Sequence, residues 1–145
     1  MNRNMALRLV LVLVGLAHLA LGLIANLAPP DTLVRVGSGF YGASIELTPQ
    51  VHHLTRIVGA FMIGVSVMAF LASLNPQRNK AVILGIVVVL LLRVAQRVVL
   101  ASEITTAFGI ASARIWIQAA FFLLTAIALI VLWPRSPGRS TTAGG

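Results

Sequence analysis

Apolar residues dominate four long stretches of the chain, and polar or helix-breaking residues separate them. The stretches cover about residues 5–27, 51–74, 81–101 and 113–133. Each is close to the roughly 20 helical residues that cross the hydrocarbon core of a bilayer. The pattern predicts an all-α integral membrane protein, with a four-helix transmembrane bundle as a single domain over residues 1–135.

Helix breakers set the expected ends of these helices. They are Pro29-Pro30, Asn75-Pro76, the polar stretch 102–112 and Pro134. Thr48 followed by Pro49 is a typical helix start, because threonine caps an N-terminus and proline fits the first helical position. The long first loop, residues 28–50, mixes apolar residues with glycines. We expect a short hairpin or a re-entrant cap there.

Composition supports a bilayer as the solvent of this chain. Of 145 residues, 59% are hydrophobic and 10% are charged, whereas soluble domains carry about 25% charged residues. A chain this short cannot bury so much apolar surface by itself, so lipid must cover part of it. The chain has no cysteine, which excludes disulfides, thiolate metal sites and thiol nucleophiles.

The basic residues predict an orientation. Those near the ends of the stretches are Arg3, Arg8, Arg78, Lys80, Arg135 and Arg139. Only Arg35 lies in the first loop, and cytoplasmic loops are enriched in Lys and Arg, so we expect both termini to be cytoplasmic and the first loop to lie outside. The net charge of +8 is scattered over helix ends rather than gathered on one face, so no nucleic-acid partner is expected. The first stretch is expected to be a retained helix, not a cleaved signal, and the tail 136–145 to be disordered.

Polar side chains recur at one depth in the outer half of all four predicted helices. The candidate ligand-binding residues are His18, His53, Arg56, Arg93, Gln96, Arg97, Arg114 and Gln118. Helical wheels give one stripe per helix, and we expect the first two stripes, which contain small residues, to face inward. The stripes are Gly15, His18 and Gly22; Arg56, Gly59, Ser66 and Ser73; Arg93 and Arg97; and Arg114, Gln118, Phe121 and Thr125.

The arginines of this layer have two interpretations. Four arginines against the three acids of the chain, Asp31, Glu46 and Glu103, leave a positive surplus. An anionic lipid or small molecule would neutralise that surplus through bidentate contacts. Alternatively, the arginines extend to the lipid headgroups or pair with Glu103 and backbone carbonyls. The sequence leaves both open.

Chemistry beyond binding has little support in the sequence. His18 and His53 are the only pair that could face each other across a haem, and no carboxylate within a predicted span has metal-ligand spacing. No Ser-His-Asp set can be assembled, so no enzyme activity and no cofactor are expected.

The sequence favours a non-enzymatic accessory or interaction protein, with a membrane-protein partner or a second copy. Glycines at four positions would permit close helix contacts; they are Gly15, Gly22, Gly59 and Gly64. An anion binder is the main alternative, and a haem or quinone redox subunit is a distant one.

Three segments resemble a known family. They are "LAPP" (27–30), "HHLTRIVGAFMIGVSVMAFLA" (52–72) and "RVAQRVVL" (93–100). The chain resembles the small bacterial four-helix membrane proteins catalogued as domain of unknown function 4345, at Arg56, Gly59, Gly64 and Arg97. The resemblance implies a four-helix fold in the bacterial inner (plasma) membrane, and it implies no activity.

Overall fold

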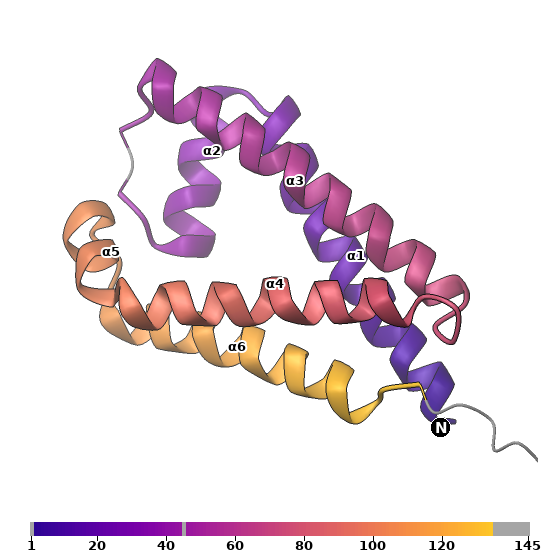
Figure 1. The fold of residues 1–145 in the computed structure, drawn as a ribbon. Coiled ribbons are helices and arrows are strands. Elements are labelled where there is room, and N and C mark those ends of the chain that lie inside the picture. The colour runs from indigo at the N-terminus through magenta and orange to yellow at the C-terminus, as the bar shows by residue number, and fades with distance from the viewer. Residues whose placement is uncertain (1, 45, 135–145) are drawn as a thin grey trace, which may run out of the picture.

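Four long helices form the body of the protein (Figure 1). The computed structural model describes residues 2–44 and 46–134, and every regular element in those ranges is helical. The long helices are α1 (Arg3–Leu27), α3 (Pro49–Leu74), α4 (Lys80–Val99) and α6 (Ser112–Val131). Each is long and apolar enough to cross a membrane, which confirms the predicted all-helical fold with four potential membrane spans. The tail predicted to be disordered lies outside the described residues.

Local sequence explains where the long helices begin and end. The Thr48 hydroxyl accepts a hydrogen bond from the Val51 N–H at 3.3 Å, and Pro49 takes the first helical position, as predicted. The polar stretch 102–112 separates α4 from α6, as predicted, and its first part forms an additional short helix, α5 (Ala101–Phe108). No breaker interrupts that segment before Gly109, which ends the helix with φ 64°.

The first loop is helical over residues 30–41, and its described residues, 28–44 and 46–50, form no hairpin. Helix α2 (Pro30–Val36) starts at a proline in the first helical position, and the π-helical turn η1 (Gly37–Tyr41) continues it. Asp31 lies in the first turn and Arg35 in the last turn, where the helix dipole favours a negative and a positive charge, respectively. The prolines that end α1 therefore start a new helix. This helix lies at the same end of the molecule as α5 (Figure 1) and lines one cavity together with residues of α1 and α3.

The four long helices form two pairs that meet at one end and diverge at the other. Helix α1 packs along α3, and α4 packs along α6. We call the end where α1 begins the closed end, and the end that carries α2, η1 and α5 the open end (Figure 1). The main hydrophobic core lies toward the closed end, with Leu7, Leu11, Ala69, Ala72, Ile83, Ile86 and Leu129 among its members.

Two arginines of α1 fasten the closed end. Arg8 donates to the Leu74 carbonyl at 3.3 Å, and Arg3 donates to the carbonyls of Val131 and Trp133. These carbonyls lie at or just beyond the C-termini of α3 and α6, where helix dipoles favour positive charge. Arg3 thus links the two helix pairs at the closed end, and Arg8 links α1 to α3 within one pair.

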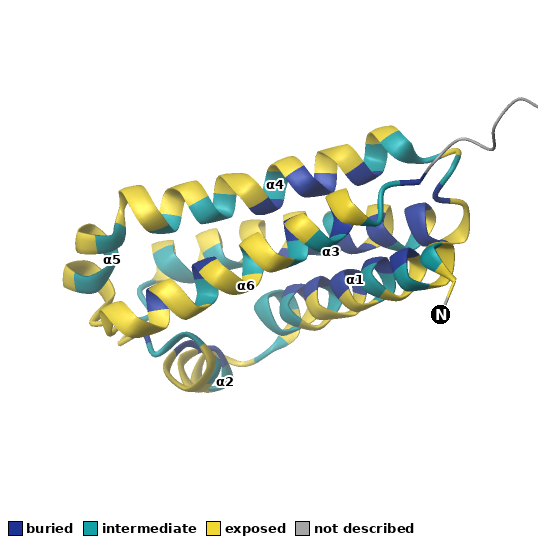
Figure 2. Ribbon diagram, turned by 90° about the horizontal axis from the view of Figure 1, so that it is seen from below, coloured by how far each residue is buried: buried dark blue, intermediate teal, exposed yellow. Residues whose placement is uncertain are grey.

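Glycines bring α1 and α3 into close contact. A Cβ atom on Gly22 would lie 2.8 Å from the Gly59 carbonyl oxygen, and one on Gly59 would lie 2.7 Å from the Ala25 Cβ. Gly15 is similarly close to the Phe70 ring, at 2.8 Å. Gly64 differs, because a Cβ there would meet nothing within 4 Å. Buried residues face the inside of the bundle and exposed apolar residues face outward (Figure 2), as a lipid environment requires.

Candidate functional site

Arg93 and Arg97 lie one turn apart on α4 and share a single aromatic ring. Their guanidinium carbons lie 5.1 and 5.5 Å from the centroid of the Phe122 ring on α6. Both side chains are half-buried, and a partly desolvated cation–π contact contributes up to about 2 kcal/mol. The ring therefore orients two positive charges toward the same space.

Neither guanidinium is neutralised by the part of the chain that the structure describes. Arg93 and Arg97 have no hydrogen bond and no ion pair there, and Glu103, the acid considered as a partner, is exposed on α5. Their nitrogen atoms are also not among the polar atoms sealed inside the protein. Like charges one helical turn apart repel each other, so the pair favours a bound anion.

The two arginines line an open cavity of about 480 Å³. We call it the headgroup cavity; its lining is Tyr41, Ala43, Arg93, Gln96, Arg97, Leu100, Ile104, Phe108 and Ile110. Burial raises the pKa of the Tyr41 hydroxyl, and the charges of Arg93 and Arg97 offset part of that rise. Tyr41 is therefore a protonated hydrogen-bond donor at neutral pH. The cavity offers two cations, a hydroxyl and an amide, with no acid in its lining.

A second cavity of about 480 Å³ adjoins the first. This apolar cavity lies between α1, α2 and α3; its lining is Leu21, Ile24, Ala25, Leu33, Val34, Val36, Gly37, Tyr41, Leu47, Val51, Leu54, Thr55, Val58, Met62, Arg93 and Phe108. Arg93 is the one charged residue of that lining. Three residues, Tyr41, Arg93 and Phe108, line both cavities.

The other predicted arginines do not join this pair. Arg114 donates to the carbonyls of Ser38 and Gly39 at 3.4 and 3.3 Å, so it holds η1 against α6. Arg56 is exposed on α3 and lines neither cavity. The four arginines therefore do not form one layer. Two of them line the same cavity, Arg114 makes a structural contact, and Arg56 is exposed at the surface.

The remaining candidates are also spread over the bundle. His18 is buried, its Nδ1 lies 2.8 Å from the Val14 carbonyl, and its Nε2 has no partner among the described residues. The contacts of Gly15 and Gly22 place it opposite the middle of α3, near Ser66. His53 is exposed in the first turns of α3, about 20 Å along the helix from Ser66. The two histidines cannot share a haem.

Gln96 and Gln118 have different surroundings. Gln96 is exposed and lines the headgroup cavity beside Arg97. Gln118 is half-buried one turn from Phe122, and its Oε1 atom has no partner in the described ranges. Of the eight predicted residues, the structure brings three together at one cavity, namely Arg93, Gln96 and Arg97.

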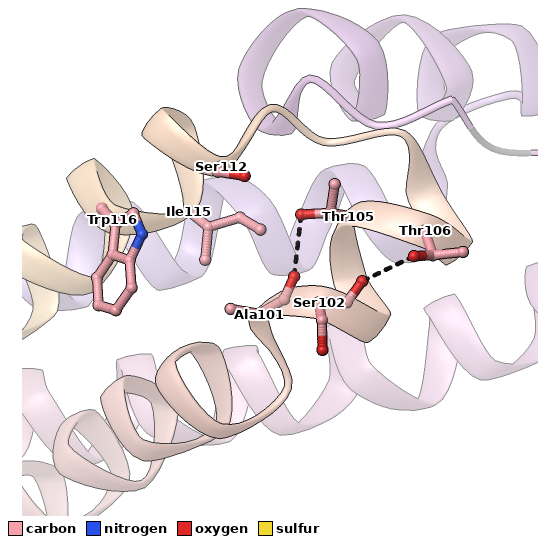
Figure 3. Close-up of a pocket in the computed structure, with 7 residues that line it drawn as sticks. All are labelled: Ala101, Ser102, Thr105, Thr106, Ser112, Ile115 and Trp116. Carbon is pink, nitrogen blue, oxygen red and sulfur yellow. Dashed lines mark hydrogen bonds between the residues drawn. The ribbon is translucent and has the colours of Figure 1, made fainter.

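A third cavity, of about 400 Å³, lies between α5 and α6 (Figure 3). Its two threonine hydroxyls donate within α5: Thr105 to the Ala101 carbonyl at 2.9 Å, and Thr106 to the Ser102 carbonyl at 3.0 Å. Trp116 forms one side. No charged residue lines this cavity, so it offers an anion nothing comparable to the arginine pair.

Sequence reasoning missed three aromatic residues of the site, Tyr41, Phe108 and Phe122. The signal for Phe122 was present, because it follows Gln118 by four residues and so lies on the same helix face. The helical wheel grouped Phe121 rather than Phe122 with Arg114 and Gln118, and Phe121 is 64% exposed. Tyr41 and Phe108 reach the site through α2, η1 and α5, which the sequence pattern did not predict.

Comparison with known proteins adds no relative to this description. No known protein family, no curated protein and no solved structure matches the chain. The resemblance to domain of unknown function 4345 therefore gains no support.

Replacing Gly42 should loosen the contact between η1 and α6. Gly42 has φ 71°, and a Cβ atom there would lie 2.9 Å from the Arg114 Cδ. We expect Gly42→Ala to lower the free energy of unfolding by about 1–3 kcal/mol, because a residue with a side chain is strained in this conformation. Thermal unfolding in detergent measures the change. Gly39→Ala is the matched control, since a Cβ there meets nothing within 4 Å, and an equal loss in both variants would contradict the assigned role.

Proposed function

We propose that the protein binds the anionic headgroup of a membrane amphiphile in the headgroup cavity. One observation carries this proposal: two guanidinium groups that lie over the Phe122 ring, with no hydrogen bond or ion pair to any described residue, line an open cavity. Lipid phosphates and carboxylates are the anions that a membrane supplies at this depth. The earlier alternative of an anion binder is therefore favoured over an accessory protein of unspecified role.

The chemistry of the cavity suits an oxyanion with several acceptor atoms. Each guanidinium presents a planar fork of N–H donors, which matches a phosphate or carboxylate with two parallel hydrogen bonds. The protonated Tyr41 hydroxyl and the Gln96 amide add neutral donors on the same wall. A bound anion would remove the repulsion between Arg93 and Arg97 and gain charge-assisted hydrogen bonds at the same time.

The proposed orientation places this site in the outer leaflet. Arg3, Arg8 and Arg78 lie at the closed end, and we propose that this end faces the cytoplasm of a bacterium, with both termini inside. The headgroup cavity then opens toward the outer half of the inner membrane. An accessory role, in a complex or in a homo-oligomer, stays a prediction and is compatible with lipid binding.

Headgroup selectivity tests the proposal. Purified protein in dodecyl maltoside is titrated with lysophosphatidylglycerol, which is anionic, and with lysophosphatidylcholine, which is zwitterionic, and binding is measured by native mass spectrometry. We expect preference for the anionic lipid. Arg97→Gln should weaken that binding about tenfold or more, because a hydrogen bond to a charged group contributes about 1.5–3 kcal/mol. Arg97→Lys should weaken it too, since an ammonium lacks the planar fork.

Arg56→Gln provides the matched control. It removes the same charge and leaves the headgroup cavity intact, because Arg56 is exposed on α3. The proposal expects its affinity for lysophosphatidylglycerol to stay within about twofold of the wild type. Equal losses in Arg56→Gln and Arg97→Gln would mean that surface charge alone attracts the lipid, and the proposal would then be wrong.

A further inference from the structure

The apolar cavity adjoins the headgroup cavity, and the two together fit an amphiphile. We infer that the apolar cavity holds one hydrocarbon chain of the same ligand, and that the ligand is an anionic phospholipid drawn from the bilayer. This inference rests on the proposed function, because the arginine pair holds the headgroup. The inference adds that the ligand has a hydrocarbon chain, that this chain lies in the apolar cavity, and that the ligand comes from the bilayer.

Shared walls connect the two cavities. Tyr41, Arg93 and Phe108 line both of them, so a molecule bound at Arg93 needs no separate path to enter the apolar side. The charge is confined to this junction, since the rest of the apolar cavity lining is uncharged. A ligand with charge at one end and hydrocarbon at the other matches this distribution.

The shape of the apolar cavity suits a chain. Its lining on α3 runs from Val51 to Met62, a distance of about 16 Å at 1.5 Å per residue. Its volume of about 480 Å³ falls within the range of about 300–1,000 Å³ for ligand pockets. Met62, at the closed-end limit of this lining, is buried, so the far end of the chain would be enclosed by protein.

The bilayer is the source that the surroundings favour. Two lining residues, Leu54 and Val58, are 59% and 49% exposed, so the cavity is open to the surroundings of the bundle. The cavity is therefore bordered by the surface that lipid covers. Water has almost no polar partners in an apolar cavity, and a chain tethered by its bound headgroup has a high effective concentration beside it.

Space-filling variants test where the chain lies. Met62→Trp and Thr55→Phe each add volume inside the apolar cavity, whereas Val67→Phe adds it on an exposed part of α3 outside the cavity. Binding to the full chain in dodecyl maltoside is measured by native mass spectrometry with two probes, dioleoyl phosphatidylglycerol and dihexanoyl phosphatidylglycerol. The two probes share a headgroup and differ in chain length. Palmitate serves as a competitor.

The expected results separate this inference from the proposed function. Met62→Trp and Thr55→Phe should lower the affinity for the dioleoyl probe about tenfold, with the dihexanoyl affinity and the Val67→Phe variant nearly unchanged. Arg97→Gln should lower the affinity for both probes. The wild type should prefer the long-chain probe, a comparison that does not depend on the folding of any variant.

Three outcomes would overturn the inference. If the wild type binds both probes equally while Arg97→Gln still weakens both, the chain does not enter the cavity and the headgroup proposal stands. If Arg97→Gln affects neither probe, the headgroup proposal itself fails. If palmitate displaces the dioleoyl probe at an equal concentration, the ligand is a free fatty acid and not a bilayer phospholipid.

Discussion

Gly59→Leu should separate α1 from α3 and lower the free energy of unfolding by about 3 kcal/mol or more. Even a Cβ atom at this position would lie 2.7 Å from the Ala25 Cβ and 3.1 Å from the Gly22 carbonyl oxygen. The helix backbones must move apart to admit a larger side chain, and overpacking of a tight contact costs about 1–3 kcal/mol or more. Thermal unfolding followed by circular dichroism in detergent measures the loss.

Gly64→Leu is the matched control for this prediction. It makes the same substitution five residues later on the same helix, where a Cβ meets nothing within 4 Å. Because glycine costs a helix about 1 kcal/mol relative to good helix formers, we expect this variant to be as stable as the wild type or slightly more so. If the two variants lose stability equally, the close approach of α1 and α3 is not what the glycine at position 59 provides.

The long helices could be predicted from the sequence because a bilayer imposes a strong rule. A spanning helix needs an apolar run of about 20 residues, and the four predicted runs match the observed helices to within a few residues. This rule applies only to helices that span the membrane, so it does not predict the shorter helices. Helices α2 and α5 have 7 and 8 residues, which is too few for a periodic pattern to distinguish a helix from a polar loop.

The candidate site could be predicted only in part. A helical wheel shows which residues share one face of a helix, but it does not show which other helix packs against that face. The inward stripes of α1 and α3 were correct for Gly22, Gly59 and Ser66, which are buried. Arg56 was placed on the same stripe, yet it is exposed. The Gly59 face of α3 packs against Gly22 and Ala25 near the end of α1, which stops at Leu27, so a residue one turn earlier on α3 lies at the limit of that contact. The pairing of α1 with α3, and of α4 with α6, arises from tertiary packing that a single sequence does not reveal.

Arg93→Leu should shift the melting temperature in opposite directions in two preparations of the protein. In delipidated protein, the substitution removes the repulsion with Arg97 and replaces a charge that has no ion pair with an apolar group, which can still pack against Phe122. Such a replacement is often neutral or stabilising. We expect a rise of about 2–4 °C, equivalent to about 1 kcal/mol. With dioleoyl phosphatidylglycerol present, the wild type gains binding energy that the variant has lost. A ligand at 100 times its dissociation constant stabilises by about 2.7 kcal/mol, so the variant should melt below the wild type.

Differential scanning fluorimetry on both preparations checks this reversal. Arg35→Leu is a suitable control, because Arg35 is exposed on α2 and lines neither cavity. Its shift should have the same sign with and without lipid. A shift of the same sign for Arg93→Leu in both preparations would mean that no bound anion relieves the repulsion between Arg93 and Arg97.

The composition of co-purifying lipid tests the central claim most directly. Three proteins are extracted from the same membranes and compared by lipid mass spectrometry: the wild type, the double variant Arg93→Gln with Arg97→Gln, and the double variant Arg35→Gln with Arg56→Gln. Both double variants lose two positive charges, but only the first loses the pair that faces the headgroup cavity. We predict that an anionic phospholipid is enriched with the wild type and the second variant, and that the first variant loses this enrichment. The account would be contradicted if both double variants retained the lipid equally, or if both lost it equally.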